Sequence, residues 1–329
     1  MRRILIWTGI TLLLLTGALV IAFRFSPWPS VLVIRYIFSQ GDAQAQSLLE
    51  KHIPAGIVTH TNLAYGAGPD ERFDLSLPPG ATEPLPVVVW IHGGAWIAGA
   101  KEGVANYLKV LAGEGFATIA VEYSTGFGST YPTPVVQINT ALDYITKHAA
   151  EIGIDPDRII LAGDSAGAQL AAQVALIITN ATYAQAIQIE PGLGENQLRA
   201  VILASGAYDM QSIDLDGDWA WFLNTVFWAY TGVRDFLGDE KFELASVQQF
   251  VSPSFPAAYI TSGNGDPLEP QARRLATTLA GFGVPIVTLF FEADHEPALP
   301  HEFQFNLDTS EGQQAFAGIV NFSRNWLAQ

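Results

Sequence analysis

The stretch 157–173 constrains the fold more than any other part of this 329-residue chain. A short apolar run, 159–162, leads into Gly163-Asp-Ser-Ala-Gly167, and small and apolar residues with helical spacing follow as far as Ile178. Glycines on both sides of Ser165 allow a strand and a helix to approach closely at a sharp turn. We therefore predict a strand, a tight turn with Ser165 at its apex, and a helix whose first N–H groups favour negative charge beside the serine hydroxyl.

Composition and charge narrow the class of protein. The chain is 49% hydrophobic and 15% charged, which is typical of one large α/β domain or two small ones. It has no cysteine, so disulfides and thiolate metal sites are excluded, and its net charge of −16 argues against nucleic acid as a partner.

Asp214, Asp216 and Asp218 resemble the start of a calcium loop, but Gly217 is misplaced and no glutamate follows at the required distance, so we predict no metal.

The N-terminus has the properties of a membrane span. Residues 4–23 are apolar or small and carry no charge, with Arg2 and Arg3 before them and Arg24 after them. Twenty helical residues cross a bilayer core. The run is longer than a usual signal core and no small-x-small site follows it, so we predict an uncleaved single-pass anchor in residues 1–24, with a cleaved signal as the alternative. The leading arginines place the N-terminus on the cytoplasmic side and the catalytic domain on the other side.

Residues 25–56 form a juxtamembrane segment. Trp28, Arg35 and Tyr36 are residue types that settle at the level of lipid headgroups. This composition predicts a short interfacial helix, and a helix that covers the core of the domain is the alternative.

Residues 57–329 alternate between apolar runs and helical segments, which implies a mostly parallel sheet flanked by helices. Two strands, 59–65 and 72–77, are expected to open the domain as an antiparallel pair. Further strands are expected at 87–91, 116–121, 159–162, 198–205, 257–262 and 284–291, and helices at 102–113, 134–150, 168–178, 271–280 and 313–327. The segment 206–256 lies between two strands and is rich in aromatic residues, which indicates either core or an inserted cap over the site.

His92-Gly-Gly-Ala-Trp96 follows the strand 87–91. Glycines at such a position can turn backbone N–H groups toward a common point, as a developing oxyanion requires. We therefore predict an oxyanion hole made by the N–H groups of Gly93, Gly94 and Ala166. His92 is expected to order this loop rather than to act as a base.

With these motifs the chain resembles the α/β-hydrolase family, and within it the hormone-sensitive-lipase-like carboxylesterases and their feruloyl-esterase-like relatives. The resemblance covers residues 57–327 and also includes Tyr131-Pro132 and Asp155-Pro-Asp-Arg158. Two departures are Ala95, where the motif commonly has a third glycine, and Ser124, where many relatives have arginine. The resemblance implies an α/β-hydrolase fold with an inserted cap, and a serine esterase that needs no cofactor.

The acid and the base are expected after late strands, because the hydrolase order is nucleophile, acid, histidine. Asp266 follows the strand 257–262 and its Asp-Pro-Leu matches the family's acid motif, with Asp209 as the competing acid. His301 resembles the base of the family's His-x-Phe, whereas His295 lies four residues past the last strand. We choose His301, because Glu296 to Pro300 reads as an inserted loop.

The predicted triad is therefore Ser165, Asp266 and His301, acting on a small-molecule ester through an acyl-enzyme. An amidase or peptidase on the same triad is the alternative within enzymes. A catalytically silent hydrolase fold that binds a ligand at the membrane is the alternative from another class. The sequence sets no oligomeric state.

Overall fold

The alternating apolar runs form one eight-stranded sheet in the computed structural model, which describes residues 2–328 and the side chains from Ile4 onward. Met1 and the side chains of Arg2 and Arg3, on which the predicted orientation across the membrane rests, lie outside the described part. The sheet has the order β1-β2-β4-β3-β5-β6-β7-β8. The antiparallel opening pair β1–β2 and the mostly parallel sheet agree with the sequence prediction, and β2 also pairs antiparallel with β4, which was not predicted.

The strands lie close to their predicted positions. They are β1 (Val58–Ala64), β2 (Arg72–Leu77), β3 (Leu85–Ile91), β4 (Ala117–Val121), β5 (Ile154–Asp164), β6 (Leu198–Ala204), β7 (Ala257–Thr261) and β8 (Ile286–Leu289). The helices are α1 (Arg2–Phe25), α2 (Trp28–Leu49), α3 (Ala105–Ala112), α4 (Thr133–Lys147), α5 (Ala149–Ile152), α6 (Ala166–Thr179), α7 (Ala181–Ile187), α8 (Ala220–Thr231), α9 (Glu240–Glu243), α10 (Glu269–Gly281) and α11 (Ser310–Leu327).

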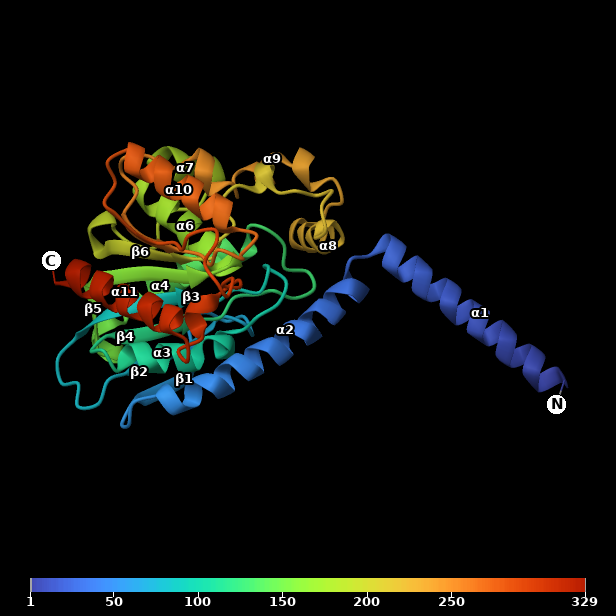
Figure 1. The fold of residues 1–329 in the computed structure, drawn as a ribbon, viewed down its shortest axis with the longest axis horizontal. Helices are drawn as coiled ribbons and strands as arrows, with labels where there is room; N and C mark the ends of the chain where they lie inside the picture. The colour runs from blue at the N-terminus through green and yellow to red at the C-terminus, as the bar shows by residue number, and fades with distance from the viewer. Residues whose placement is uncertain (1, 329) are drawn as a thin grey trace.

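Helices cover both faces of the sheet, with α3 and α11 together on one of them (Figure 1). Val87, Val89 and Ile91 of β3 face the core that includes α4, α6 and α10. Val88 and Trp90 of the same strand face the core beneath α3 and α11. Because both faces are buried, the parallel strands have continuous apolar sequences. Each buried aliphatic side chain of this size stabilises the fold by about 1.5–3 kcal/mol.

The predicted strand-turn-helix around Ser165 is present between β5 and α6. Ser165 has φ 51° and ψ −122°, a conformation that non-glycine residues rarely adopt, and its N–H donates to the carbonyl of Ala204 at 2.8 Å. At Gly167 an added Cβ would lie 2.0 Å from the carbonyl oxygen of Ile91. Only glycine permits this approach, so the start of α6 packs directly against the end of β3.

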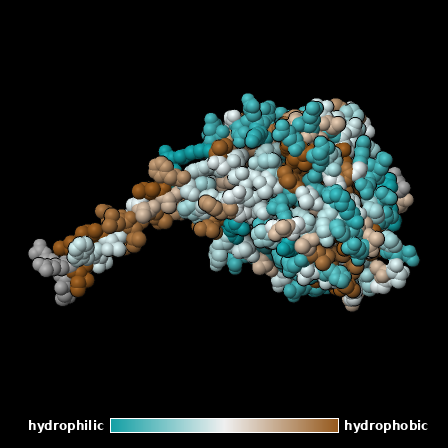
Figure 2. Space-filling model, turned by 180° about the vertical axis from the view of Figure 1, so that it is seen from behind, coloured by the Kyte–Doolittle hydropathy of each residue, from teal (hydrophilic) through white to brown (hydrophobic). Residues whose placement is uncertain are grey.

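The N-terminal helix α1 projects away from the body of the protein (Figure 1). Its apolar segment Ile4–Phe25 is long enough to cross a membrane and is not buried against the rest of the chain. In the space-filling view this projection is mostly brown, the colour of hydrophobic residues (Figure 2). The second long apolar stretch, α6 with α7, is bent by 114° and lies in the domain core.

Helix α2 lies along the domain over its whole length. Val31 and Ile34 near its start are buried in the core. Further along, the Gln46 side chain donates to the carbonyl of Gly103 at 2.6 Å. Just past its end, the Lys51 ammonium lies 2.7 Å from a carboxylate oxygen of Asp308. One face of α2 therefore covers the domain, as the alternative for this segment proposed.

The segment between β6 and β7 contains α8 and α9, and its aromatic residues divide between core and surface. Phe227, Tyr230 and Phe242 are buried and contact one another. Trp219 and Trp221 at the start of α8 are exposed. Part of this segment therefore belongs to the core, and the inserted cap stays a prediction.

Candidate active site

Three of the predicted site residues lie together at the carboxyl ends of strands in the same half of the sheet. Ser165 follows β5, Asp266 follows β7 and His301 follows β8. His301 Nε2 is 2.9 Å from Ser165 Oγ, and His301 Nδ1 is 2.9 Å from Asp266 Oδ2. Nδ1–H donates a hydrogen bond to the carboxylate, so in the neutral imidazole Nε2 is free to accept a hydrogen bond from the serine hydroxyl. The three side chains thus form one hydrogen-bonded line.

Asp266 is fully enclosed, yet its carboxylate is well supplied with donors. Ser262 Oγ donates to Oδ2 at 2.8 Å, and the N–H of Leu268 donates to Oδ1 at 2.9 Å. Burial raises the pKa of Asp266, but the hydrogen bond and charge of His301, together with these two donors, outweigh it, so the pKa lies below its ordinary value. Asp266 is therefore ionised at neutral pH.

The loop that carries His301 is fixed to the turn that carries Asp266. Asn264 provides two of the links, since its Nδ2 donates to the carbonyl of His295 and its Oδ1 accepts the N–H of Leu299, at 2.9 and 2.8 Å. An added Cβ at Gly263 would lie 2.3 Å from the Leu299 carbonyl oxygen. Acid and base are therefore held by one packed unit.

The alternative acid, Asp209, and the alternative base, His295, interact with other residues. His295 Nε2 lies 3.5 Å from Glu311 Oε1, and its ring is next to Phe291. Asp209 accepts the N–H of Gln211 at 3.1 Å and faces Arg274. No contact joins either residue to Ser165 within residues 2–328.

Glu302 is a site residue that the sequence analysis missed. Its Oε1 lies 3.7 Å from His301 Nε2. Burial lowers the pKa of His301, but its hydrogen bond to Asp266 and the negative charges of Glu302 and Asp266 outweigh this effect and raise the pKa of His301 to about 9. The sequence shows an acidic residue beside the base, but nothing in it indicates that this side chain turns toward the nucleophile.

Asp164, the residue before the nucleophile, joins several segments of the site. Its Oδ1 accepts Trp90 Nε1 at 2.6 Å, its Oδ2 accepts the N–H of Gly93 at 2.8 Å, and it is hydrogen-bonded to Glu302. Burial and the charge of Glu302 raise the pKa of Asp164 well above its ordinary value. A hydrogen bond between two carboxyl groups requires a proton on one of them, and the buried Asp164 is the group that retains it.

The contact with Asp164 corrects one predicted oxyanion donor. The N–H of Gly93 is already engaged by the carboxyl group of Asp164, so it is not free to bind an oxyanion. In the described part of the chain, the N–H groups of Gly94, Ala95 and Ala166 have no hydrogen-bond acceptor. Gly94 and Ala166 therefore remain candidate donors, and Ala95 joins them.

His92 lies away from the nucleophile and holds the loop that follows it. The buried ring contacts the carbonyl of Gly93 through Nδ1 at 2.7 Å and Glu122 through Nε2 at 3.2 Å, and it stacks on Tyr123. Burial lowers the pKa of His92, but the adjacent Glu122 carboxylate outweighs it, and the net pKa is raised.

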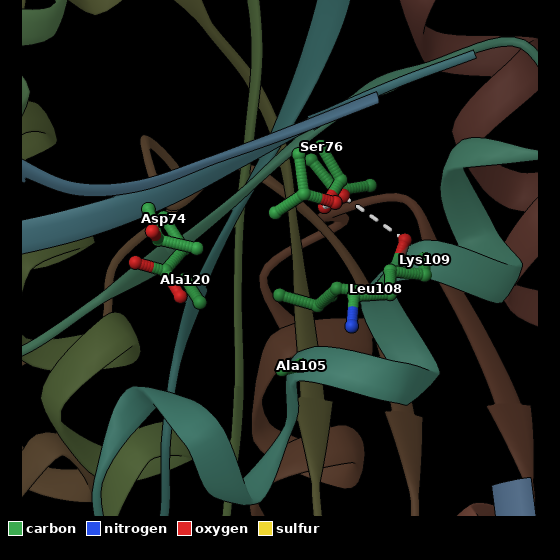
Figure 3. Close-up of a pocket in the computed structure, with 9 residues that line it drawn as sticks. Asp74, Ser76, Ala105, Leu108, Lys109 and Ala120 are labelled. Carbon is green, nitrogen blue, oxygen red and sulfur yellow. Dashed lines mark hydrogen bonds between the residues drawn. The ribbon is translucent and has the colours of Figure 1, made fainter. Parts of the chain in front are cut away.

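A small cavity of about 40 Å³ lies elsewhere, between the β1–β2–β4 edge of the sheet and α3 (Figure 3). Asp74 and Ser76 of β2 and Ala105 and Lys109 of α3 lie around it. Asp74 is paired with Lys101 Nζ at 3.0 Å, and no histidine is among its lining residues. It has no nucleophile and base pair and contributes nothing to the site at Ser165. Among the described residues, no cluster of three or more histidine or acidic side chains is arranged to hold a metal.

The sheet, the strained serine turn and the Ser-His-Asp line define the class of α/β-hydrolase folds. The sequence profile of the BD-FAE family matches residues 73–279, and the chain therefore belongs to that family. Among solved structures, esterase B from Lactobacillus rhamnosis has a TM-score of 0.77 at 21% identity and covers 92% of this chain and 96% of its own. A bacterial heroin esterase has a TM-score of 0.68 at 23% identity, covering 88% and 90%.

Curated relatives match shorter parts of the chain. A probable isoprenylcysteine alpha-carbonyl methylesterase of Arabidopsis thaliana is 31% identical over 158 residues, which are 46% of this chain and 32% of that protein. Esterase LipQ of Mycobacterium tuberculosis is 26% identical over 244 residues, which are 67% of this chain and 56% of LipQ. The matches thus span between a third and little more than half of these relatives.

The raised pKa of His301 leads to a pH-dependence prediction. A general base must be unprotonated, so we expect kcat/KM for a soluble ester to rise with pH through an apparent pKa near 9. Glu302→Gln removes the negative charge beside Nε2, so it should move this limb to lower pH. The control is Glu311→Gln, which removes a charge beside His295 instead. A limb that stays in place in Glu302→Gln, or moves equally in Glu311→Gln, would contradict the electrostatic origin.

The same raised pKa contributes to stability with the opposite pH trend. The folded pKa of about 9 lies above the ordinary value of 6.5, so the protonated imidazole is stabilised in the folded state. This contribution is fully present below pH 6.5 and is lost as the pH rises through 9. Activity therefore increases over the range in which this contribution to stability decreases.

Proposed function

We propose that this chain is a serine carboxylesterase that hydrolyses carboxylic esters through an acyl-enzyme. The hydrogen-bonded line Ser165–His301–Asp266 at the carboxyl ends of β5, β7 and β8 is the observation that carries the proposal. Membership of the BD-FAE family and the esterase names of the relatives support it. The retained nucleophile, base and acid speak against a silent binding protein.

The reaction runs in two halves. Ser165 Oγ attacks the ester carbonyl carbon while His301 Nε2 takes the hydroxyl proton and then delivers it to the departing alcohol. Asp266 keeps Nδ1 protonated and stabilises the imidazolium. The N–H groups of Gly94, Ala95 and Ala166 bind the oxyanion of each tetrahedral intermediate. Water, deprotonated by His301, then attacks the acyl-enzyme and releases the carboxylic acid and free Ser165.

The proposal includes attachment to a membrane by residues 1–24. The apolar helical segment Ile4–Phe25 supports it, because its side chains are exposed and its length, about 33 Å at 1.5 Å per residue, suffices to cross a bilayer core. A single helix of this kind near the N-terminus is also compatible with a signal sequence, which a fractionation experiment separates from an anchor. The segment 206–256, which contains α8 and α9, is proposed to act as a cap beside the site.

The identity of the base is tested by three single variants assayed on one short-chain ester. His301→Ala should lower kcat by a factor comparable to Ser165→Ala, about 10⁴ or more, because a serine without its base is a poor nucleophile near neutral pH. The matched control is His295→Ala, which removes a histidine of the same loop that does not contact Ser165 and should lower kcat less than about threefold.

Folding of each variant is checked by circular dichroism. A severe loss of activity in His295→Ala together with a mild loss in His301→Ala would show that His295 is the base and would contradict the choice of His301. Retention of more than about a tenth of the activity in Ser165→Ala would contradict the nucleophile itself.

Membrane attachment is tested by flotation of the full-length chain with phospholipid vesicles. We expect the protein to float with the vesicles even in high salt, because burial of about twenty apolar residues, rather than charge, holds it. Deleting residues 1–23 should leave the remaining chain in the soluble fraction with its activity on soluble esters retained. Expression of the full-length chain that yields a soluble product beginning near Arg24 would instead show that the segment is a cleaved signal.

A further inference from the structure

The first turns of α2 are apolar on both faces. Val31 and Ile34 are buried against the domain, whereas Leu32, Tyr36 and Ile37 point outward and are at least 60% exposed. The following residues, 39–47, include no large apolar side chain. The outward apolar surface is therefore concentrated at the end of α2 that adjoins α1.

Two other segments add exposed aromatic residues at the same end of the molecule. Phe127, in the loop after β4, is 80% exposed, and its ring lies 4.8 Å from that of Trp28 at the start of α2. Trp219 and Trp221 at the start of α8 are 59% and 61% exposed. Soluble surfaces rarely gather this much exposed apolar area without a partner.

A cavity of about 280 Å³ lies between the end of α1 and helix α8. Phe23 and Ser26 line it from the side of α1, and Trp221, Asn224 and Trp228 line it from α8. Arg234 completes the lining, with its guanidinium 5.0 Å from the centre of the Trp228 ring. Aromatic rings mixed with hydroxyl, amide and arginine groups are typical of the headgroup level of a bilayer.

We propose that Leu32, Tyr36, Ile37, Phe127, Trp219 and Trp221 form a docking face that lies on the phospholipid bilayer entered by α1. The proposal rests on the membrane attachment proposed above. Lipid is the partner of this face because the face is continuous, through Ser26 and Pro27, with the exposed apolar segment Ile4–Phe25 and with the cavity at the end of that segment. A face that begins where the span ends meets the interfacial layer of the same bilayer.

The docking face is connected to the active site through the packing of α8. On its inner side, α8 places Phe227 and Tyr230 against Trp96, with ring centroids 5.6 and 5.4 Å apart. Trp96 closes the His92-Gly-Gly-Ala-Trp96 segment, which carries Gly94 and Ala95. The same helix therefore contacts the membrane with one side and the candidate oxyanion loop with the other. Esters dissolved in or carried by the bilayer are the substrate class that this arrangement serves.

The absence of native cysteine allows single labels to test the docking face. Tyr36→Cys, Phe127→Cys and Trp221→Cys, each in the full-length chain, are labelled with the environment-sensitive fluorophore NBD and reconstituted into phosphatidylcholine vesicles. Phe282→Cys is the matched control, because Phe282 is an exposed aromatic residue that precedes β8 and so lies at the amino end of this strand, away from the carboxyl ends that carry the site. All four labels are at exposed positions and should leave the fold intact, which circular dichroism checks.

We expect labels at 36, 127 and 221 to show blue-shifted emission and about twofold or stronger quenching by nitroxide-labelled phosphatidylcholine, with neither effect at 282. A blue shift without quenching means that protein, such as a second copy of the chain, covers the face, and it overturns the proposal. Aqueous spectra at all three positions in a chain that floats with vesicles overturn the docking face alone. A full-length chain that does not float with vesicles would contradict both the anchor and the docking face. Activity on soluble esters tests the triad separately.

Discussion

The buried carboxyl group of Asp164 is the interaction on which the arrangement of the site depends. It sits one residue before the nucleophile and reaches three other segments: Trp90 at the end of β3, the N–H of Gly93 in the loop after β3, and Glu302 beside the base. Each of these partners belongs to a part of the chain that must be aligned with Ser165. Because burial and the charge of Glu302 raise the pKa of Asp164, the group stays neutral and avoids the cost of a buried charge. The same contact explains why Gly93 is a structural residue rather than an oxyanion donor.

The site residues and the proposed membrane contact lie at the same end of the sheet. The carboxyl ends of the strands carry Ser165, Asp266 and His301, and the same end receives α8, the loop with Phe127 and the start of α2. The proposed membrane contact and the proposed chemistry thus share one side of the molecule.

Much of this could be predicted from the sequence, because the relevant signals are local. The apolar runs fix the strands, since parallel strands buried on both faces leave continuous apolar stretches, and the glycines around Ser165 fix the turn. The proline-bounded Glu296 to Pro300 pointed to His301, which the structure brings to Ser165. The rest depends on contacts distant in sequence. Nothing local shows that the Gly93 N–H meets a carboxyl group 71 residues later, or that Glu302 faces Asp164. Likewise, the pattern of α2 could not show which of its apolar residues pack on the domain and which stay exposed.

Stoichiometric labelling of the folded full-length protein with a fluorophosphonate, followed by mass spectrometry, tests most directly whether Ser165 is an activated nucleophile. We predict one phosphonyl group per chain, on the peptide that contains Ser165, with a labelling rate that rises with pH as His301 loses its proton. Absence of labelling in folded protein, or an adduct on a different serine, would contradict it.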